Sequence, residues 1–226
     1  MISFFSLKSL SLIVNDDEED THYMNGISSS SSNNVSIGSS TGHILIIEYN
    51  KGRKEFHEKQ KLFTINNPIT ALAQSNIYLV CANGDGDVFV FDSTDEYKLL
   101  GQYKGSGFTC TCLGIKGDII IAGYITGHIK LFNANDIEVF IEITAHIRMI
   151  TGMDVHPNEN IFITCSEDHY VQVWALPIRL TSSSIINTIF TRKLENKLCT
   201  GIAFLSDGRI CVSSYDDNEL NIFVKQ

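Results

Sequence analysis

Three side chains in one stretch of the chain are of the types that hydrolytic chemistry uses. His146, Ser166 and Asp168 could act as base, nucleophile and orienting acid, as in a serine hydrolase. Such a serine usually lies in a G-x-S-x-G turn, beside a glycine-rich loop whose N–H groups stabilise the oxyanion. Ser166 lies instead in TCSEDH, and no such loop occurs in the sequence. We therefore predict structural roles for these side chains and no catalytic residue.

A second cluster has the composition of a metal site. Asn83, Asp85 and Asp87 are similar to the opening of a calcium-binding loop. Val88 then stands where that loop needs glycine, and Thr94 stands where it needs a bidentate glutamate. The cluster predicts a hairpin turn rather than a calcium site.

Cysteine and histidine residues do not form a metal pattern either. Cys110 and Cys112 have CxC spacing, but no second pair of ligands accompanies them, so we expect both in the core. His43 and His128 stand at the same position after a turn in two similar segments, which indicates a repeated structural unit. No P-loop, dinucleotide fingerprint or HExxH sequence is present. We expect no bound metal and no cofactor.

The composition is that of a folded protein without a nucleic-acid-binding charge. Of the 226 residues 43% are hydrophobic and 19% are charged, which is typical of a globular chain. Because 17 basic residues face 26 acidic ones, the net charge is −9, and neither nucleic acid nor a membrane is an expected partner. Six cysteines without a CxxC pair indicate a reducing compartment. The expected location is the cytoplasm, with the nucleus as the alternative.

The first 34 residues differ in kind from the rest of the chain. They contain the acidic run DDEED at 16–20 and the low-complexity run SSSSSNN at 28–34. Segments of this composition bury too little apolar surface to fold alone. We predict a disordered tail over 1–34 and a folded region over 35–226.

A repeated unit organises the folded region. Each unit has a strand of small residues, a polar turn and an alternating strand that ends in a bulky apolar residue, as in IIAGYITGHIKLFN (120–133). Equivalent turn residues follow one another at intervals of 44, 41, 42 and 49 positions, at Thr41, Asp85, Thr126, Asp168 and Asp217. A period of about 40 to 45 residues with strand alternation is typical of β-propeller blades. The predicted fold class is therefore all-β.

The segment 145–176 resembles a WD repeat. Ala145-His146 stands where that family has Gly-His, and Asp168 lies in the turn six residues before Trp174. In WD repeats a loop His, a Ser or Thr of the second strand, the turn Asp and the Trp form a buried hydrogen-bond chain. The resemblance implies the same structural chain here, made of His146, Thr164 or Ser166, Asp168 and Trp174.

The number of units predicts an incomplete ring. The units from residue 36 to 224 make about four to five four-stranded blades, whereas seven blades need about 290 to 300 residues. The order and the amino-acid sequences of these units resemble those of one member of the WD-repeat family that is longer at its N terminus. We predict an open arc whose first and last blades expose apolar faces and strand edges, which favours self-association.

Most WD-repeat proteins are non-catalytic platforms, and the resemblance implies the same role here. The predicted function is a scaffold that presents propeller rim loops to partner proteins. Two alternatives stay open: a hydrolase that uses the propeller channel, and a fragment that works only inside a larger assembly. Ionisable groups that converge at the axis with shifted pKa values would favour the enzyme. Because aromatic, Met and Arg side chains are frequent at interfaces, the predicted partner-binding residues are Phe108, Arg148, Met149 and Glu167.

Overall fold

The computed structural model describes residues 24–29, 34–53, 55–64 and 67–224. In this part of the chain every regular element is a β-strand, and nineteen strands form five antiparallel sheets. Each sheet consists of strands that follow one another in the sequence, so neighbouring strands are joined by hairpins or short connections. We call the sheets blade 1 to blade 5 in chain order. The predicted all-β fold is confirmed.

The first three blades have four strands each. Blade 1 contains β1 (Met24–Ser29), β2 (Asn34–Ser39), β3 (His43–Asn50) and β4 (Glu55–Phe63). Blade 2 contains β5 (Ile69–Gln74), β6 (Tyr78–Asn83), β7 (Val88–Asp92) and β8 (Lys98–Tyr103). Blade 3 contains β9 (Cys110–Lys116), β10 (Ile119–Tyr124), β11 (His128–Asn133) and β12 (Val139–Thr144).

The last two blades differ in strand number. Blade 4 contains β13 (Ile150–Val155), β14 (Ile161–Ser166), β15 (Tyr170–Ala175) and β16 (Thr188–Lys193). Blade 5 contains β17 (Cys199–Phe204), β18 (Ile210–Ser214) and β19 (Asn221–Phe223). Within the described ranges no fourth strand pairs with β19. Blade 5 therefore has an open outer edge there.

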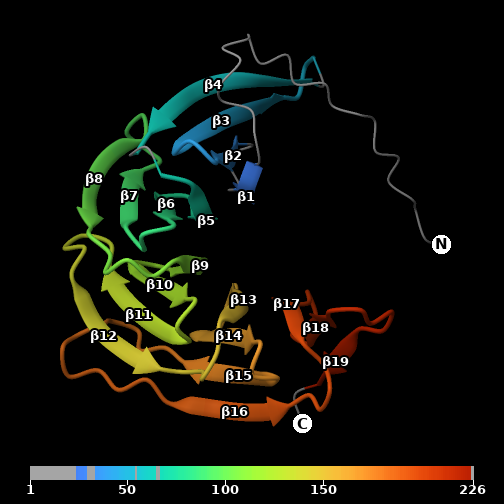
Figure 1. Ribbon diagram of the computed structural model, residues 1–226. Helices are drawn as coiled ribbons and strands as arrows, with labels where there is room; N and C mark the ends of the chain where they lie inside the picture. The colour runs from blue at the N-terminus through green and yellow to red at the C-terminus, as the bar shows by residue number, and fades with distance from the viewer. Residues whose placement is uncertain (1–23, 30–33, 54, 65–66, 225–226) are drawn as a thin grey trace.

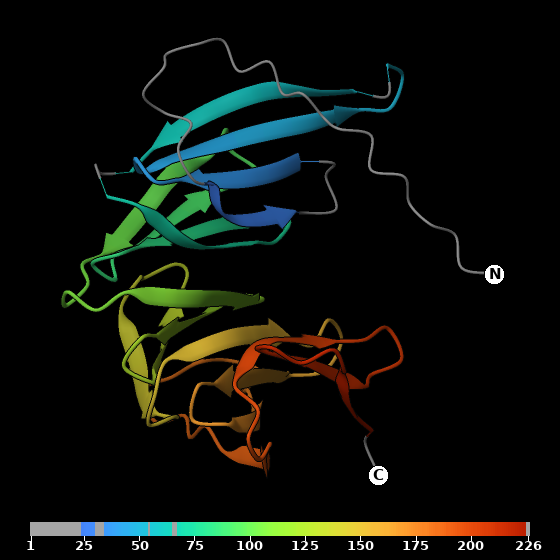
Figure 2. The same ribbon diagram turned by 45° about the vertical axis from the view of Figure 1, so that its right-hand side comes forward.

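The blades stand side by side in an open arc (Figure 1). The first strand of each blade lies on the inner side of the arc, and successive inner strands β5, β9, β13 and β17 contact one another. Blades 1 and 5 lie at the two ends of the arc, as the rotated view also shows (Figure 2). No core cluster among the described residues joins them. The predicted incomplete ring of four to five blades is confirmed.

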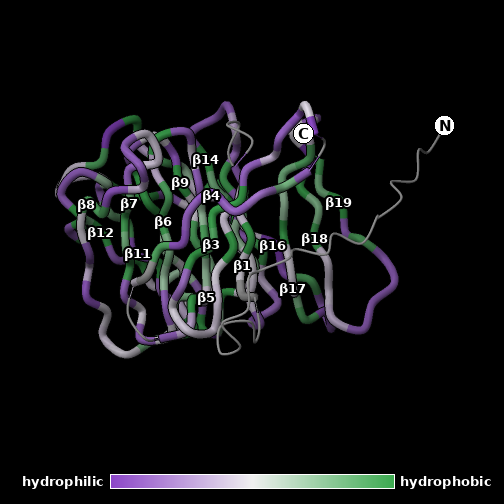
Figure 3. The backbone as a smooth tube through the Cα atoms, turned by 90° about the horizontal axis from the view of Figure 1, so that it is seen from above, coloured by the Kyte–Doolittle hydropathy of each residue, from purple (hydrophilic) through white to green (hydrophobic). Residues whose placement is uncertain are grey.

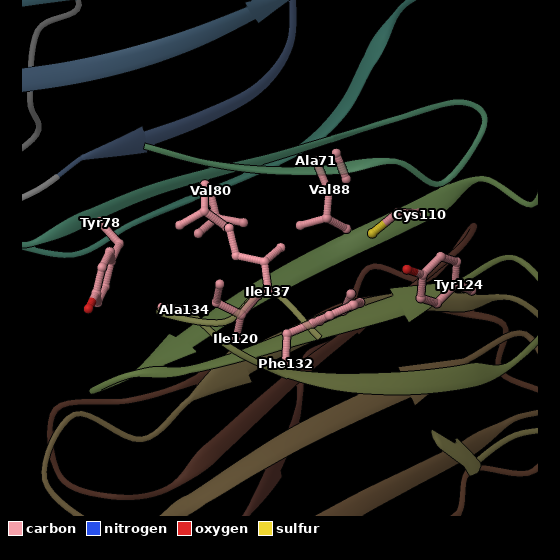
Figure 4. Close-up of a cluster of buried hydrophobic side chains, with 13 residues drawn as sticks. Ala71, Tyr78, Val80, Val88, Cys110, Ile120, Tyr124, Phe132, Ala134 and Ile137 are labelled. Carbon is pink, nitrogen blue, oxygen red and sulfur yellow. The ribbon is translucent and has the colours of Figure 1, made fainter. Parts of the chain in front are cut away.

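Apolar side chains are buried between consecutive blades. Val80 and Val88 of blade 2 share a cluster with Ile120 and Phe132 of blade 3 (Figure 4). Alternate residues of a strand point to opposite faces, so each blade contributes to the core on either side of it. Burial of each such side chain stabilises the fold by about 1.5 to 3 kcal/mol. Hydrophobic stretches accordingly follow the strands, and hydrophilic ones gather at the loops of the two rims (Figure 3).

The first blade begins earlier than the sequence indicated. β1 lies within the segment assigned to the tail, and it pairs with β2 in antiparallel register, with Ile27 opposite Ile37. An inner strand faces the axis of the arc, so it needs few apolar residues, and its composition resembles that of a loop. The folded region thus includes β1, which lies before the predicted boundary at residue 35. Residues 1–23 and 30–33 lie outside the described residues, and the predicted disorder there stays a prediction.

Candidate functional site: the rim around His146

Four side chains of blade 4 form a continuous hydrogen-bond chain. His146 precedes β13, Thr164 lies on β14, Trp174 lies on β15, and Asp168 lies in the turn between β14 and β15. Trp174 Nε1 donates to Thr164 Oγ1 at 2.9 Å, and that oxygen lies 2.9 Å from His146 Nε2. His146 Nδ1 lies 2.9 Å from Asp168 Oδ2. All four residues are buried.

The donors and acceptors of this chain determine the protonation of His146. The Asp168 carboxylate can only accept, so the ring nitrogen beside it must donate, and Nε2 of a neutral ring accepts from the Thr164 hydroxyl, which itself accepts from Trp174 Nε1. Nδ1 therefore carries the imidazole proton and donates to Asp168. Burial lowers the pKa of His146 and outweighs the Asp168 carboxylate, which raises it. The contact is thus a hydrogen bond from a neutral imidazole.

Asp168 and Ser166 connect this chain to the neighbouring backbone. Asp168 Oδ2 accepts from the N–H of Ile147 at 3.2 Å. Ser166, the other candidate for the hydroxyl position, donates to the Arg148 carbonyl at 3.2 Å and accepts from the Asp168 N–H at 3.1 Å. Thr164 is therefore the hydroxyl of the chain, and Ser166 fixes the turn against the loop before β13.

This geometry does not assemble a hydrolytic site. Ser166 donates to a backbone carbonyl instead of His146, so it lacks the base that would activate a nucleophile. Thr164 contacts the imidazole, but it has no exposed surface on which a substrate could bind. The arrangement has a mechanical effect: it fixes the loop before β13 to the β14–β15 turn.

Blade 2 makes the corresponding connection with Asn83 and Asp87, which the sequence analysis assigned only to a hairpin turn. Asn83 Nδ2 donates to Asp87 Oδ2 at 3.0 Å, and Asp87 Oδ1 accepts from the N–H of Gly105 at 2.7 Å, in the loop before β9. The sequence repeat placed Asp85 at the position of Asp168, but Asp85 is exposed. Asp87 directly precedes the apolar run VFVF at 88–91 of β7. A carboxylate beside such a run is buried and needs hydrogen-bond partners, so the run was the available signal.

The turns of blades 1 and 3 contain a smaller version of this connection. Thr41 Oγ1 lies 3.0 Å from His43 Nδ1, and Thr126 Oγ1 lies 3.1 Å from His128 Nδ1. The two histidines are therefore repeats of one turn. The Asn83–Asp87 segment likewise connects β6 and β7 as a hairpin. In the described part of the chain no three His, Cys, Asp or Glu side chains are placed to hold a metal ion.

The two cysteines with CxC spacing belong to the packing between blades. Cys110 is fully buried in the cluster between blades 2 and 3, and Cys112 packs against the cluster between blades 3 and 4. Burial raises the pKa of Cys112 to about 12 and raises that of Cys110 well above its usual value. Both thiols stay protonated near neutral pH and are poor nucleophiles.

The loops before β9 and β13 and the β6–β7, β10–β11 and β14–β15 turns lie on one rim of the arc. We call it the His146 rim. Ile125 N donates to the Thr109 carbonyl at 3.0 Å, and Ala145 N donates to the Gly127 carbonyl at 3.2 Å. Gly127 has a φ of 81°, and a Cβ atom there would collide with the His146 carbonyl. Glycine therefore allows the β10–β11 turn to contact the next loop closely.

All four predicted partner-binding residues lie on the His146 rim. Phe108 precedes β9 and is 52% exposed, and Arg148 precedes β13 and is exposed. Met149 and Glu167 are half-buried, and the N–H of Glu167 donates to the Met149 carbonyl at 3.1 Å. The rim therefore presents one aromatic and one cationic side chain beside partly covered neighbours.

Sequence reasoning missed two exposed apolar residues of the same rim. Ile147 is 85% exposed in the loop before β13, and Ile125 is 45% exposed in the β10–β11 turn. A signal for Ile147 existed, since it directly follows His146, whose side chain points into the blade. Phe108, Ile125 and Ile147 are thus exposed large hydrophobic side chains in adjacent segments of blades 2 to 4 on this rim.

A groove of about 240 Å³ lies among the inner strands of blades 1 to 4. Its lining includes Ser28, Gln74 and Met153, and its single ionisable side chain is Asp154. Asp154 Oδ1 accepts from the Val155 N–H at 2.8 Å, and Oδ2 accepts from the Phe204 N–H of blade 5 at 2.7 Å. Its carboxylate therefore joins two blades, and the described lining holds no group of ionisable side chains for catalysis.

Successive antiparallel blades define a β-propeller. The hydrogen-bond chain from Trp174 through Thr164 and His146 to Asp168 is that of a WD repeat. The chain belongs to the WDR54 family, whose model matches residues 15–225. It is 25% identical over 190 residues to WD repeat-containing protein 54 of Mus musculus and 26% identical over 190 residues to WD repeat domain 54 of Rattus norvegicus. Each alignment covers 81% of this chain and 54% of the relative. The chain thus spans about half the length of the curated relatives it matches.

More distant likenesses support the same fold. Cilia- and flagella-associated protein 52 of Bos taurus is 23% identical over 202 residues, which is 84% of this chain and 29% of that protein. The designed Ika8 protein matches with a TM-score of 0.68 at 21% identity, over 84% of this chain and 55% of that one. The designed Ika4 protein matches with a TM-score of 0.60 at 21% identity, over 72% of this chain and 94% of that one.

Within the described residues no helix has the length and apolarity to cross a membrane.

Proposed function

We propose that the protein is a non-catalytic scaffold that binds a partner protein on the His146 rim. The observation that carries this proposal is the group of exposed side chains Phe108, Ile125 and Ile147 on loops with fixed backbones. Large apolar side chains on ordered loops bury surface on binding at a small entropic cost, because the loops need no ordering. Membership of a WD-repeat family supports an interaction role in general.

Arg148 adds a polar contact to this apolar group. It is exposed on the same loop as Ile147, and its backbone carbonyl is fixed by Ser166. Arginine beside aromatic and aliphatic side chains is a frequent composition of binding hot spots. We infer a partner segment with apolar side chains and an acceptor for the guanidinium group, such as a carboxylate or a carbonyl.

The test compares a rim variant with a matched surface variant. The rim variant carries Phe108→Ser, Ile125→Ser and Ile147→Ser, and the control carries Ile178→Ser and Ile189→Ser, two exposed isoleucines outside the rim. Proteins captured by the wild type from a lysate are identified and purified, and their affinities are measured by calorimetry. We expect at least a tenfold weaker Kd for the rim variant and an unchanged Kd for the control. Equal affinities of the two variants would exclude the rim as the binding surface.

The proposal includes a cytoplasmic location. Its support is the state of the cysteines: all six are free thiols, and four of them are buried. A reducing compartment keeps such thiols reduced. A fluorescent fusion expressed in cells tests this location, and fluorescence confined to the secretory pathway would contradict it.

A further inference from the structure

One face of blade 5 has no neighbouring blade among the described residues. Ala203 of β17, Cys211 of β18 and Ile222 of β19 pair across the three strands on this face. Their neighbours along the strands point the opposite way, since Val212 is buried against blade 4. Ala203 is exposed, Cys211 is half-buried, and Ile222 is 41% exposed. We call this surface the blade 5 face.

The same positions are buried in the preceding blades. In blades 2, 3 and 4 the equivalents of Cys211 and Ile222 are Val80 and Val90, Ile121 and Leu131, and Ile163 and Val173. Each of these side chains is covered. Gly114 is the blade 3 equivalent of Ala203, and a Cβ atom there would lie only 2.5 Å from Val155 Cγ2 of blade 4. The blade 5 face therefore has the composition of an interior inter-blade surface.

A repeated threonine also connects each blade to the next one. It is the second residue of the inner strand, and its hydroxyl donates to the carbonyl of the first residue of the next inner strand. The three bonds run from Thr70 to Cys110 (2.6 Å), from Thr111 to Ile150 (2.7 Å) and from Thr151 to Cys199 (2.8 Å). This hydrogen bond thus recurs at three consecutive inter-blade contacts.

Thr200 holds the same position in blade 5. Its hydroxyl lies 3.2 Å from Ser213 Oγ of its own blade. The described residues include no sixth inner strand whose carbonyl could accept from it. Blade 5 therefore keeps both elements of an inter-blade contact, the apolar row and the hydroxyl donor.

Blade 1 presents the complementary surface at the other end of the arc. Blade 3 packs against the blade before it through Ile120 and Phe132, and the equivalent pair in blade 1 is Val35 and Ile47. On this face Ile47 is buried, Val35 is half-buried and Ile27 of β1 is 70% exposed, so its accessible part lies at β1 and β2. As the first residue of β1, Met24 places its carbonyl where Cys110, Ile150 and Cys199 accept from threonine.

We propose that a second copy of the chain docks its blade 1 on the blade 5 face, with Thr200 Oγ1 donating to the Met24 carbonyl of the second copy. The contact is head to tail, since one copy contributes the last blade and the other the first. It continues the interface that already joins consecutive blades within the chain. This inference is independent of partner binding on the His146 rim.

The first experiment is sedimentation of the purified full chain between about 1 and 100 µM. We expect the mean mass to rise with concentration. Ile222→Asp places a charge on the blade 5 face and should keep the chain monomeric, and Thr200→Val should weaken the association about fivefold. Ile178→Asp is the matched control, because Ile178 is 93% exposed in the β15–β16 connection, and it should associate like the wild type. Circular dichroism verifies that each variant is folded.

A mixing experiment separates the head-to-tail contact from a symmetric one. Ile27→Asp blocks the blade 1 side, so this variant and Ile222→Asp should each be monomeric. Their equimolar mixture retains one intact pair of faces and should form a dimer that does not grow further. A wild-type chain that is monomeric at 100 µM would overturn the proposal. Self-association of Ile27→Asp like that of the wild type would overturn it as well.

Discussion

At His146, burial and hydrogen bonding act on the imidazole in opposite directions. Burial favours the neutral ring, whereas the nearby Asp168 carboxylate favours the protonated ring, and the effect of burial is larger. The neutral ring with a proton on Nδ1 gives every polar atom of the chain a partner: Trp174 and Thr164 each donate once, and Asp168 accepts. Removing one member leaves a buried polar atom without its partner.

We expect His146→Ala or Asp168→Ala to lower the free energy of unfolding by about 2 to 4 kcal/mol. Each substitution removes one end of the buried hydrogen bond, so the two losses should not add. Urea denaturation of the single and double variants measures this coupling. His57→Ala is the control, because His57 lies on the surface 3.6 Å from Glu48, and it should unfold like the wild type. Single variants with wild-type stability would contradict the assigned chain.

The lowered pKa of His146 also predicts a pH dependence. In the folded state this pKa lies below the usual 6.5, so the unfolded chain binds the proton first as the pH falls. The stabilising contribution of His146 is therefore present above about pH 6.5 and is lost as the pH falls through the folded pKa. We expect the stability difference between the wild type and His146→Gln to be largest near pH 7.5 and to shrink towards pH 5. A difference that grows on acidification would show that the folded pKa is raised.

At the scale of the strand, the inter-blade threonines link each inner strand to the next one. Thr111 Oγ1 donates to the Ile150 carbonyl at 2.7 Å and lies 3.2 Å from the Gly123 carbonyl of its own blade. One side chain thus connects β9, β10 and β13. Thr200 is the matched residue without a following blade in the described chain.

Thr111→Val should therefore lower the free energy of unfolding by about 1 to 2 kcal/mol, since the hydroxyl is lost while the shape is retained. Thr200→Val should leave the stability of the dilute monomer nearly unchanged, because its hydroxyl contacts only Ser213 of the same blade. Denaturation of both variants at about 1 µM compares them directly. Equal losses would show that the threonine acts within its own blade.

The second and third strands of each blade could be predicted from the sequence, because a strand of small residues, a polar turn and an alternating strand recur at intervals of 41 to 49 residues. β1 could not, because MNGISS at 24–29 contains few apolar residues, and its assignment depends on its pairing with β2. In the candidate site, the resemblance of the segment 145–176 to a WD repeat implied the hydrogen-bond chain. The role of Asp87 depends on where the turn directs its carboxylate, and spacing alone pointed to Asp85.

At the scale of the whole molecule, the open arc makes stability depend on position. In repeat architectures each unit is stabilised mainly by its direct neighbours. Blade 3 packs against blades on both sides, whereas blade 5 packs only on blade 4 and has three strands in the described chain. Local opening should therefore cost least at the C-terminal end of the arc.

Hydrogen exchange measured by mass spectrometry tests this gradient. Among the strand peptides of dilute protein, we expect those from β17 to β19 to exchange fastest and those from β9 to β11 slowest, because strand amides exchange when their blade opens. Raising the concentration to about 100 µM should slow the exchange of β17 to β19, since a second copy would cover the blade 5 face. Peptides from β14 and β15 provide the internal control, as both strands lie within a blade that already has two neighbours. Uniform protection across all five blades would show that the arc unfolds as one cooperative unit and that the end blade is not weaker than the interior ones.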